Sequence, residues 1–244
     1  MPDKTFPRPL SKWVIRKQYV DGLILWVTSL FSKKNLTFTF EEGRFPYFRH
    51  RYNLTWLNER TVEIPLAYHA VSQFPAKRVL EIGHVLSHYF TGLEHSVVDK
   101  YEKSSDPRVL QSDAHDFKSD NTYDLIISLS TLEHVGWDET PLDLEKVIAT
   151  IRHLERLLAP GGAFIFTVPA GYHPTLLQDL LSNKVERLHL FALQRISANN
   201  MWKQASASAH TRTKFGAPYP FANAIILGVV GNPEQVSWST KSPA

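Results

Sequence analysis

The chain has 244 residues, of which 43% are hydrophobic and 12% aromatic, so it can bury one full core. Its net charge of +3 and pI of 9.0 are too mild a basic bias for a nucleic-acid surface, so no DNA partner is expected. The absence of cysteine excludes disulfides and thiolate metal sites and is typical of a reducing compartment. The first residues lack the apolar core of a signal peptide. We therefore expect a cytoplasmic protein.

Residues 1–75 are predicted to form an N-terminal extension. A helix is predicted over residues 11–31, and its apolar part is shorter than the roughly 20 residues that cross a bilayer. Basic residues flank this helix, so it either packs on the core or contacts a partner or a membrane surface. Residues 37–40 alternate like a strand, and a second helix is predicted to end at Val71. Residues 44–56 are dense in arginine and aromatic side chains, which either form a lid over an acceptor or cover the edge of the core.

Short apolar runs alternate with helical patterns over residues 76–232. Strands are predicted at 78–82, 96–99, 109–110, 125–130, 163–168, 187–196 and 223–230. Helices are predicted at 84–93, 143–159 and 174–183. This alternation indicates an α/β domain with a seven-stranded, mostly parallel sheet and helices on both faces. Residues 203–220 are predicted to form a loop, and 233–244 a tail.

Acidic residues stand at the ends of three successive predicted strands, namely Glu81, Asp99 and Asp113. Because the carboxyl ends of parallel strands meet at one edge of a sheet, the three can face a single ligand. A ribose offers two hydroxyls to a carboxylate, and an adenine amino group offers a donor to another. Gly83 follows the first of these strands and lets the backbone approach the ligand. The pattern predicts a nucleoside site.

These segments resemble the motifs of the class I S-adenosylmethionine-dependent methyltransferases. Residues 79–83 are similar to the first motif, 97–99 to the second, whose acid holds the ribose hydroxyls, and 112–114 to the adenine-contacting segment. Residues 123–135 and 157–169 resemble the fourth strand with its turn and the entrance to the fifth strand. The resemblance implies a Rossmann-like fold with S-adenosylmethionine as cofactor. It implies cofactor contacts from Glu81, Ile82, Gly83, His84, Asp99, Lys100, Asp113, Ala114 and Ser130.

The first motif departs from the family's glycine-rich pattern, because Val85 and Ser87 stand where later glycines are expected. Either the side chains of His84 and Ser87 replace the lost backbone contacts, or Val85 and the two histidines partly fill the pocket. The resemblance implies methyl transfer, and the basic, aromatic segments 44–56 and 203–220 favour a small polar or anionic acceptor, such as a sugar or metabolite with a hydroxyl or amine. The alternative is a catalytically inactive, methyltransferase-like binding or scaffold subunit.

A base beside the acceptor assists methyl transfer to a hydroxyl or amine. His134 follows the fourth strand and is the predicted base, with Glu133 as its orienter or as an alternative base, and Asp138 is a further candidate. A purely structural role for His134, packing the turn under the cofactor, is the competing interpretation. His84 and His88 are spaced like metal ligands on a helix, but the H-E-x-x-H pattern is absent, so no metal site is predicted.

Overall fold

The computed structural model describes residues 36–74 and 77–240. A compact unit begins at Thr37, upstream of the domain boundary predicted at residue 75, because residues 37–74 share their cores with the sheet. The helix predicted over residues 11–31 lies outside the described residues. Within the described residues, no helix is both long and apolar enough to cross a bilayer.

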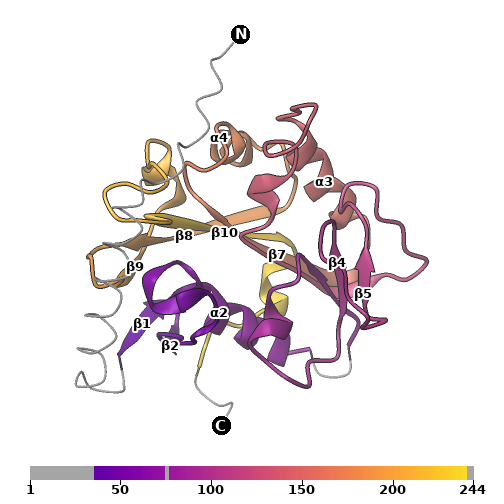
Figure 1. Cartoon of the computed structure of the whole chain (residues 1–244), viewed down its shortest axis with the longest axis horizontal. Coiled ribbons are helices and arrows are strands. Elements are labelled where there is room, and N and C mark those ends of the chain that lie inside the picture. Colours follow the sequence, from indigo (N-terminus) through magenta and orange to yellow (C-terminus); the bar gives the residue numbers. More distant parts are fainter. Residues whose placement is uncertain (1–35, 75–76, 241–244) are drawn as a thin grey trace. The chain divides into compact units, whose positions relative to one another are not determined.

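A mixed sheet of eight strands runs through this unit in the order β5-β4-β3-β6-β7-β10-β8-β9 (Figure 1). The first five strands in this order are parallel neighbours. Strand β10 pairs antiparallel with both β7 and β8, and β9 pairs antiparallel with β8. The strands are β3 Val79–Ile82, β4 Ser96–Asp99, β5 Val109–Gln111, β6 Tyr123–Leu129, β7 Leu158–Pro169, β8 Leu188–Arg195, β9 Trp202–Ala205 and β10 Ala224–Gly231.

The α/β class and the mostly parallel sheet are confirmed, but the strand count is eight instead of seven. The additional strand, β9, begins the segment 203–220 that was predicted to be entirely a loop. It lies at the sheet edge, where Lys203 and Gln204 are exposed, so it lacks the apolar alternation that reveals a strand in sequence. Strand β7 is also longer than predicted, since Leu158 already pairs with Tyr123 before a shift in register.

Helices cover both faces of the sheet, as predicted. Figure 1 shows α3 and α4 on one face, and α2 with the β1–β2 hairpin on the other. These elements are α2 Arg60–Ser72, α3 Lys146–Glu155, α4 Leu176–Leu181, β1 Thr37–Phe40 and β2 Gly43–Pro46. Successive side chains of a strand enter opposite cores, so Leu80 packs in the cluster under α3 while Val79 packs in the cluster under α2.

The helix predicted over residues 84–93 is absent, and only a short 3₁₀ turn, Leu86–His88, follows β3. The connection from β3 to β4 has only the 13 residues 83–95, which is near the minimum for a crossover with a helix. Aromatic side chains fill the space instead. The ring of Phe48 lies 5.4 Å from that of Tyr89, and Tyr68 stacks on Phe90 at 4.3 Å. Part of segment 44–56 therefore covers the connection that replaces the helix.

Candidate functional site

A cavity of about 440 Å³ lies at the carboxyl ends of β3, β4 and β6. This volume is within the usual range of small-molecule sites. Seven of the nine predicted cofactor contacts line it, and the two that do not are Glu81 and His84. The lining residues are Ile82, Gly83, Val98, Asp99, Lys100, Tyr101, Ser112, Asp113, Ala114, Ser130, Thr131, His134, Val135, Asp138 and Glu139.

Gly83 makes the tight turn that ends β3. Its backbone has φ +85°, and its N–H donates to the carbonyl of Val98 on the next strand at 2.8 Å. A Cβ at this position would overlap Thr131 Oγ1 and would lie 2.8 Å from Thr131 Cγ2. Glycine is therefore required here both by the backbone conformation and by the close approach of the turn after β6.

Asp99 presents a fixed carboxylate at the end of β4. Its Oδ1 accepts the backbone N–H groups of Tyr101 and Glu102 at 2.8 Å, and its Oδ2 accepts that of His84 at 3.1 Å. Burial opposes the charge, but these hydrogen bonds outweigh it and lower the pKa of the Asp99 carboxyl. The group is therefore ionised at neutral pH and fixed at the cavity wall, where its remaining lone pairs can accept hydroxyl hydrogens.

Asp113 belongs to a network of two acids and two lysines at the cavity rim. Its Oδ2 lies 2.8 Å from Lys100 Nζ and 2.7 Å from Lys146 Nζ, and the same two ammonium groups contact Glu139 at 3.0 and 2.6 Å. Burial opposes ionisation, but the lysines outweigh it and hold the pKa of Asp113 well below its usual range. Of these four, sequence reasoning found Asp113 and Lys100. It missed Lys146 and Glu139, which no motif marks.

Glu81 lies beneath the cavity instead of lining it. Its side chain is fully buried, its Oε1 accepts the N–H groups of Val85 and Leu86 at 3.0 and 2.8 Å, and its Oε2 lies 2.7 Å from Nε2 of buried His95. The carboxylate is thus occupied by the turn that follows Gly83. Glu81 therefore hydrogen-bonds to this turn and is not among the residues that line the cavity.

Ser130 reaches the cavity from the turn after β6, in a strained backbone conformation with φ +38°. Its hydroxyl donates to Oε1 of Glu63 at 2.5 Å, which also accepts from Thr167 at 2.6 Å. The other oxygen of Glu63 pairs with Arg60 at 3.0 Å. Helix α2 therefore holds the Ser130 turn in place through a buried carboxylate that sequence reasoning missed.

Glu133 is buried next to this cluster, only 2% exposed, and its Oε2 has no hydrogen-bond partner among the described residues. Burial raises the pKa of Glu133 well above its usual range, and the nearby carboxylates of Glu63 and Glu59 raise it further. Its Oε1 lies 3.6 Å from His134 Nε2, which is too far for a hydrogen bond. The structure does not give Glu133 the orienting contact predicted for it.

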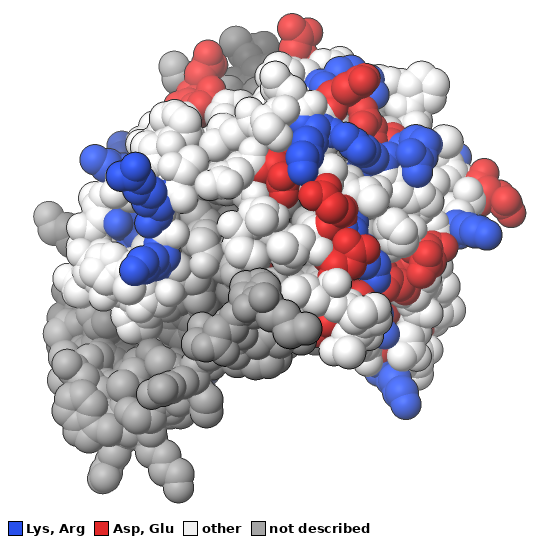
Figure 2. Space-filling model, turned by 90° about the horizontal axis from the view of Figure 1, so that it is seen from above, with Lys and Arg blue, Asp and Glu red and all other residues white. Residues whose placement is uncertain are grey.

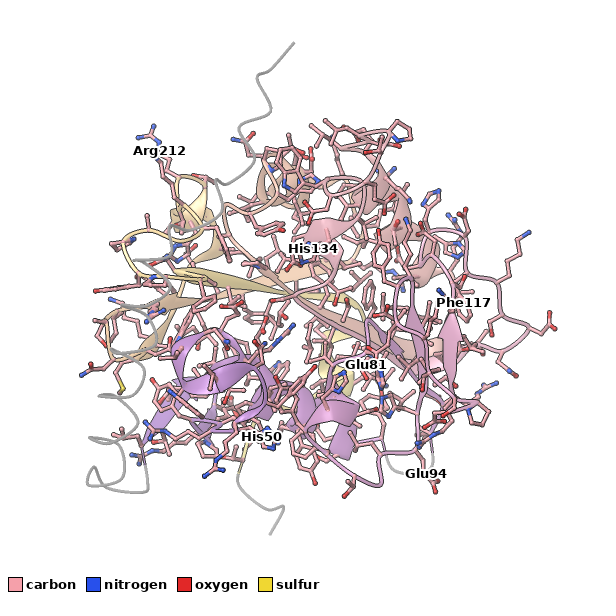
Figure 3. All side chains as sticks on the ribbon, viewed as in Figure 1. His50, Glu81, Glu94, Phe117, His134 and Arg212 are labelled. Atoms are coloured by element: carbon pink, nitrogen blue, oxygen red, sulfur yellow. The ribbon has the colours of Figure 1, made fainter. Side chains whose placement is uncertain are left out.

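His134 lies at the cavity edge with 45% of its side chain exposed, near the middle of Figure 3. Its Nδ1 is 2.5 Å from Oδ2 of Asp138, the weaker sequence candidate, and Tyr172 donates to the same oxygen at 2.8 Å. We assign the imidazole proton to Nδ1, because a carboxylate accepts hydrogen bonds. Nε2 is then left with a lone pair that can take a proton.

A second cavity, of about 630 Å³, lies between the end of β8 and the segment after β9. Its wall contains Arg195, Arg212 and Lys214 and no carboxylate. Arg212 lies on the loop at the upper left of Figure 3, in the segment predicted to form part of the acceptor lid. Between His134 at the first cavity and the segment after β9 lies Tyr172, whose ring is 4.8 Å from that of His134 and 5.1 Å from that of Phe215.

Comparison with known proteins identifies a family for most of the chain. Residues 48–212 match the family model described as "Methyltransferase domain". None of the curated proteins has a significant sequence match.

Solved structures with partial similarity include the N-methyltransferase NodS from Bradyrhizobium japonicum WM9 in complex with S-adenosyl-L-homocysteine. It is 17% identical with a TM-score of 0.44, and the match covers 69% of this chain and 84% of that chain. The sugar N-methyltransferase KedS8 from Streptoalloteichus is 12% identical with a TM-score of 0.37, over 76% of this chain and 94% of that chain. A possible histamine N-methyltransferase from Thermotoga maritima is 14% identical with a TM-score of 0.40, over 68% and 89%.

Proposed function

The chain belongs to the methyltransferase-domain family, the class I S-adenosylmethionine-dependent methyltransferases, and on this premise we propose that it methylates a hydroxyl or amine of a small polar or anionic acceptor. Its cofactor, S-adenosylmethionine, supplies a methyl group already activated by the sulfonium. The chain's own residues therefore have to bind and align the two reactants and remove a proton from the acceptor.

The first cavity fits the nucleoside part of this cofactor. We assign the ribose hydroxyls to the ionised carboxylate of Asp99, and the adenine to the apolar wall of Val98, Ala114 and Val135. Gly83 lines the same cavity, and the absence of a Cβ there lets Thr131, a second lining residue, pack closely against the turn. The remaining predicted contacts that line this cavity are Ile82, Lys100, Asp113 and Ser130.

Calorimetry with S-adenosylmethionine and with S-adenosylhomocysteine tests this assignment. We expect both ligands to bind, and Asp99→Asn to weaken binding by at least tenfold because a charged acceptor is lost, while circular dichroism shows the fold retained. Asp120→Ala, an exposed carboxylate outside the cavity, is the matched control and should bind like the parent protein. Equal affinities of Asp99→Asn and the control would refute the assignment. Absence of binding of both ligands would leave the binding-subunit alternative.

The His134–Asp138 pair is the single observation that carries the proposed chemistry. Asp138 orients the ring through Nδ1, so Nε2 is free to accept the proton of an acceptor placed at the cavity edge. Burial of Tyr172, and its hydrogen bond to Asp138, raise the pKa of its hydroxyl, so Tyr172 stays a neutral donor that fixes this carboxylate. In this assignment His134 is the base, and Asp138 and Tyr172 are positioning residues.

Kinetics of methyl transfer with an acceptor found by screening tests these roles. His134→Gln should lower kcat by roughly 10²–10⁴-fold with little change in cofactor affinity. Asp138→Asn should lower kcat and shift the pH–rate profile, which a purely structural contact would not do. His189→Gln, at an exposed histidine of β8, is the matched control. A His134→Gln enzyme with unchanged kcat would refute the proposed base.

The anionic character of the acceptor is inferred from the second cavity. Burial lowers the pKa of Arg195 to about 10, so the guanidinium remains charged at neutral pH. Arg195 donates to backbone carbonyls, whereas Arg212 and Lys214 form no ion pair with any described residue, so their charges are available to an anion. On the face shown in Figure 2, basic and acidic side chains lie side by side on the right, and the separate basic group on the left is small, which supports a small acceptor over an extended polyanion.

A panel of small amines and hydroxylated compounds, with and without a carboxylate or phosphate, tests this part of the proposal. Methyl transfer is followed by the S-adenosylhomocysteine formed. We expect anionic members to be preferred, and Arg212→Ala to raise KM for them by about tenfold with kcat maintained. Lys118→Ala, at an exposed lysine outside both cavities, is the matched control. A preference for uncharged acceptors that is unchanged in Arg212→Ala would contradict the proposal.

A further inference from the structure

Two histidines and a glutamate converge beside the cofactor cavity, outside its lining. They are His84, His88 and Glu102, and one donor atom from each lies within 4.8 Å of the other two. His84 Nδ1 is 2.8 Å from Glu102 Oε1, and His88 Nε2 is 3.6 Å from Glu102 Oε2. Among the described residues, Glu102 forms ion pairs with these two imidazoles and with no lysine or arginine.

A buried polar atom in this cluster lacks a hydrogen-bond partner. His84 Nδ1 is shielded from solvent, and although Glu102 Oε1 is close, the two atoms are not aligned as a hydrogen bond. Buried nitrogen atoms are normally paired, so an unpaired one that faces a carboxylate and a second imidazole points to a missing partner. The side chains of His88 and Glu102 are 28% and 36% exposed, which leaves a path for an ion from solvent.

The three residues are held in place by the backbone around Asp99. The N–H groups of His84 and Glu102 both donate to the Asp99 carboxylate, at 3.1 and 2.8 Å. His88 follows one short turn after His84 in the segment Leu86–His88, and the ring of Tyr52 stacks on it at 4.7 Å. The cluster is therefore organised by the local fold before any ion is present. The sequence indicated only the two histidines as possible ligands. Glu102 lies in the segment after β4, and only the fold brings it next to them.

We propose that His84, His88 and Glu102 bind a divalent first-row transition-metal ion, with Zn²⁺ as the best-fitting representative. Two imidazoles and one carboxylate form a nitrogen-rich ligand set that suits Zn²⁺, Co²⁺ or Fe²⁺, whereas Mg²⁺ and Ca²⁺ prefer oxygen ligands throughout. Ligand atoms about 2.1 Å from a tetrahedral ion are about 3.4 Å apart. The two imidazole nitrogens lie 2.8 and 3.6 Å from the Glu102 oxygens, and all ligand atoms lie within 4.8 Å of one another. These separations lie on either side of the tetrahedral value of about 3.4 Å, so small side-chain movements would complete the site.

Three protein ligands leave one position of a tetrahedral ion open for water or another small ligand. The ion would join the turn after Gly83 to the segment after β4. It would do so at the position where the family's glycine-rich loop is replaced by side chains. The site does not depend on the identity of the acceptor or on the role of His134, because none of its three ligands lines either cavity.

Metal titration of the chain without a polyhistidine tag, after removal of metals by a chelator, tests this proposal. Calorimetry with Zn²⁺ should give one site per chain with a micromolar or lower Kd, and Co²⁺ should produce visible d–d absorption bands. His88→Ala and Glu102→Gln should each weaken Zn²⁺ binding by at least tenfold and abolish the Co²⁺ bands. His189→Ala, at an exposed histidine away from the cluster, should match the parent protein.

Thermal unfolding provides a second readout. Zn²⁺ should raise the Tm of the parent protein and of His189→Ala, and should leave that of His88→Ala unchanged, since an ion that binds only the native state stabilises it. Circular dichroism of the metal-free variants confirms that they are folded. A titration without a one-to-one site, or a site whose affinity is the same in His88→Ala, Glu102→Gln and the control, would overturn the proposal.

Discussion

The turn at Gly83 provides the sharpest test of the cavity's architecture. In Gly83→Ala the new Cβ is placed on a backbone with φ +85°, which costs about 1–2 kcal/mol for a residue with a side chain. Its overlap with Thr131 Oγ1 and Cγ2 adds about 1–3 kcal/mol, as overpacking does elsewhere. We expect the free energy of unfolding to fall by about 2–5 kcal/mol in total.

Gly92→Ala is a matched control, because Gly92 has φ +84° and a Cβ there would meet nothing within 4 Å. The entropic effect of replacing glycine in the unfolded chain is shared by both variants and cancels in their difference. That difference therefore reports the contact with Thr131 alone. It should be at least about 1 kcal/mol, measured by urea unfolding monitored by circular dichroism and by tryptophan fluorescence.

The double variant Gly83→Ala/Thr131→Ala completes the test. Thr131→Ala alone loses the hydrogen bond from its hydroxyl to the Leu129 carbonyl, worth about 1 kcal/mol, but it removes Oγ1 and Cγ2, the two atoms closest to the new Cβ, and leaves only the Cβ of residue 131 at 3.1 Å. The double variant should therefore be more stable than the sum of the single effects predicts. Additive effects, or equal losses in Gly83→Ala and Gly92→Ala, would refute the reasoning.

Three further variants test the charged groups around the site. Because burial raises the native-state pKa of Glu133, the native state keeps a proton that the unfolded chain loses above pH 4.5. Stability therefore falls as pH rises from 4.5 towards the raised native pKa, and Glu133→Gln should weaken this fall in urea unfolding measured from pH 5 upwards. Lys146→Met should destabilise the fold by about 1–2 kcal/mol at pH 7, measured by urea unfolding, by removing one of two cations from Asp113 and Glu139. Since the pKa values of both acids are lowered, the network's contribution is present above their unfolded values and is lost as pH falls, so this variant should lose less stability on acidification. Arg195→Met should lower the free energy of unfolding by about 2–4 kcal/mol, because it leaves unpaired the backbone carbonyls that accept from the guanidinium; an unchanged thermal midpoint would contradict this.

The sequence by itself determined the fold class and predicted the sheet edge at which the first cavity lies. Strands such as β3 and β6 are mainly apolar and buried on both faces, so their pattern can be recognised from the local sequence. Gly83, which follows β3, and Asp99, which ends β4, lie at one edge because the carboxyl ends of parallel strands meet there. The missing helix after β3 and the edge strand β9 were not predicted, since their formation depends on what packs against them.

Which side chains contact one another at the site was determined only by the tertiary structure. Asp138 hydrogen-bonds to His134, whereas Glu133 stays 3.6 Å from its Nε2, because the turn after β6 buries one carboxylate and exposes the other. Glu81 faces the turn beneath the cavity, and Glu102 joins two histidines from across the β3–β4 connection. Such contacts join residues whose spacing along the chain carries no periodic signal. Strand order and burial create them, and therefore they become visible only in the folded chain.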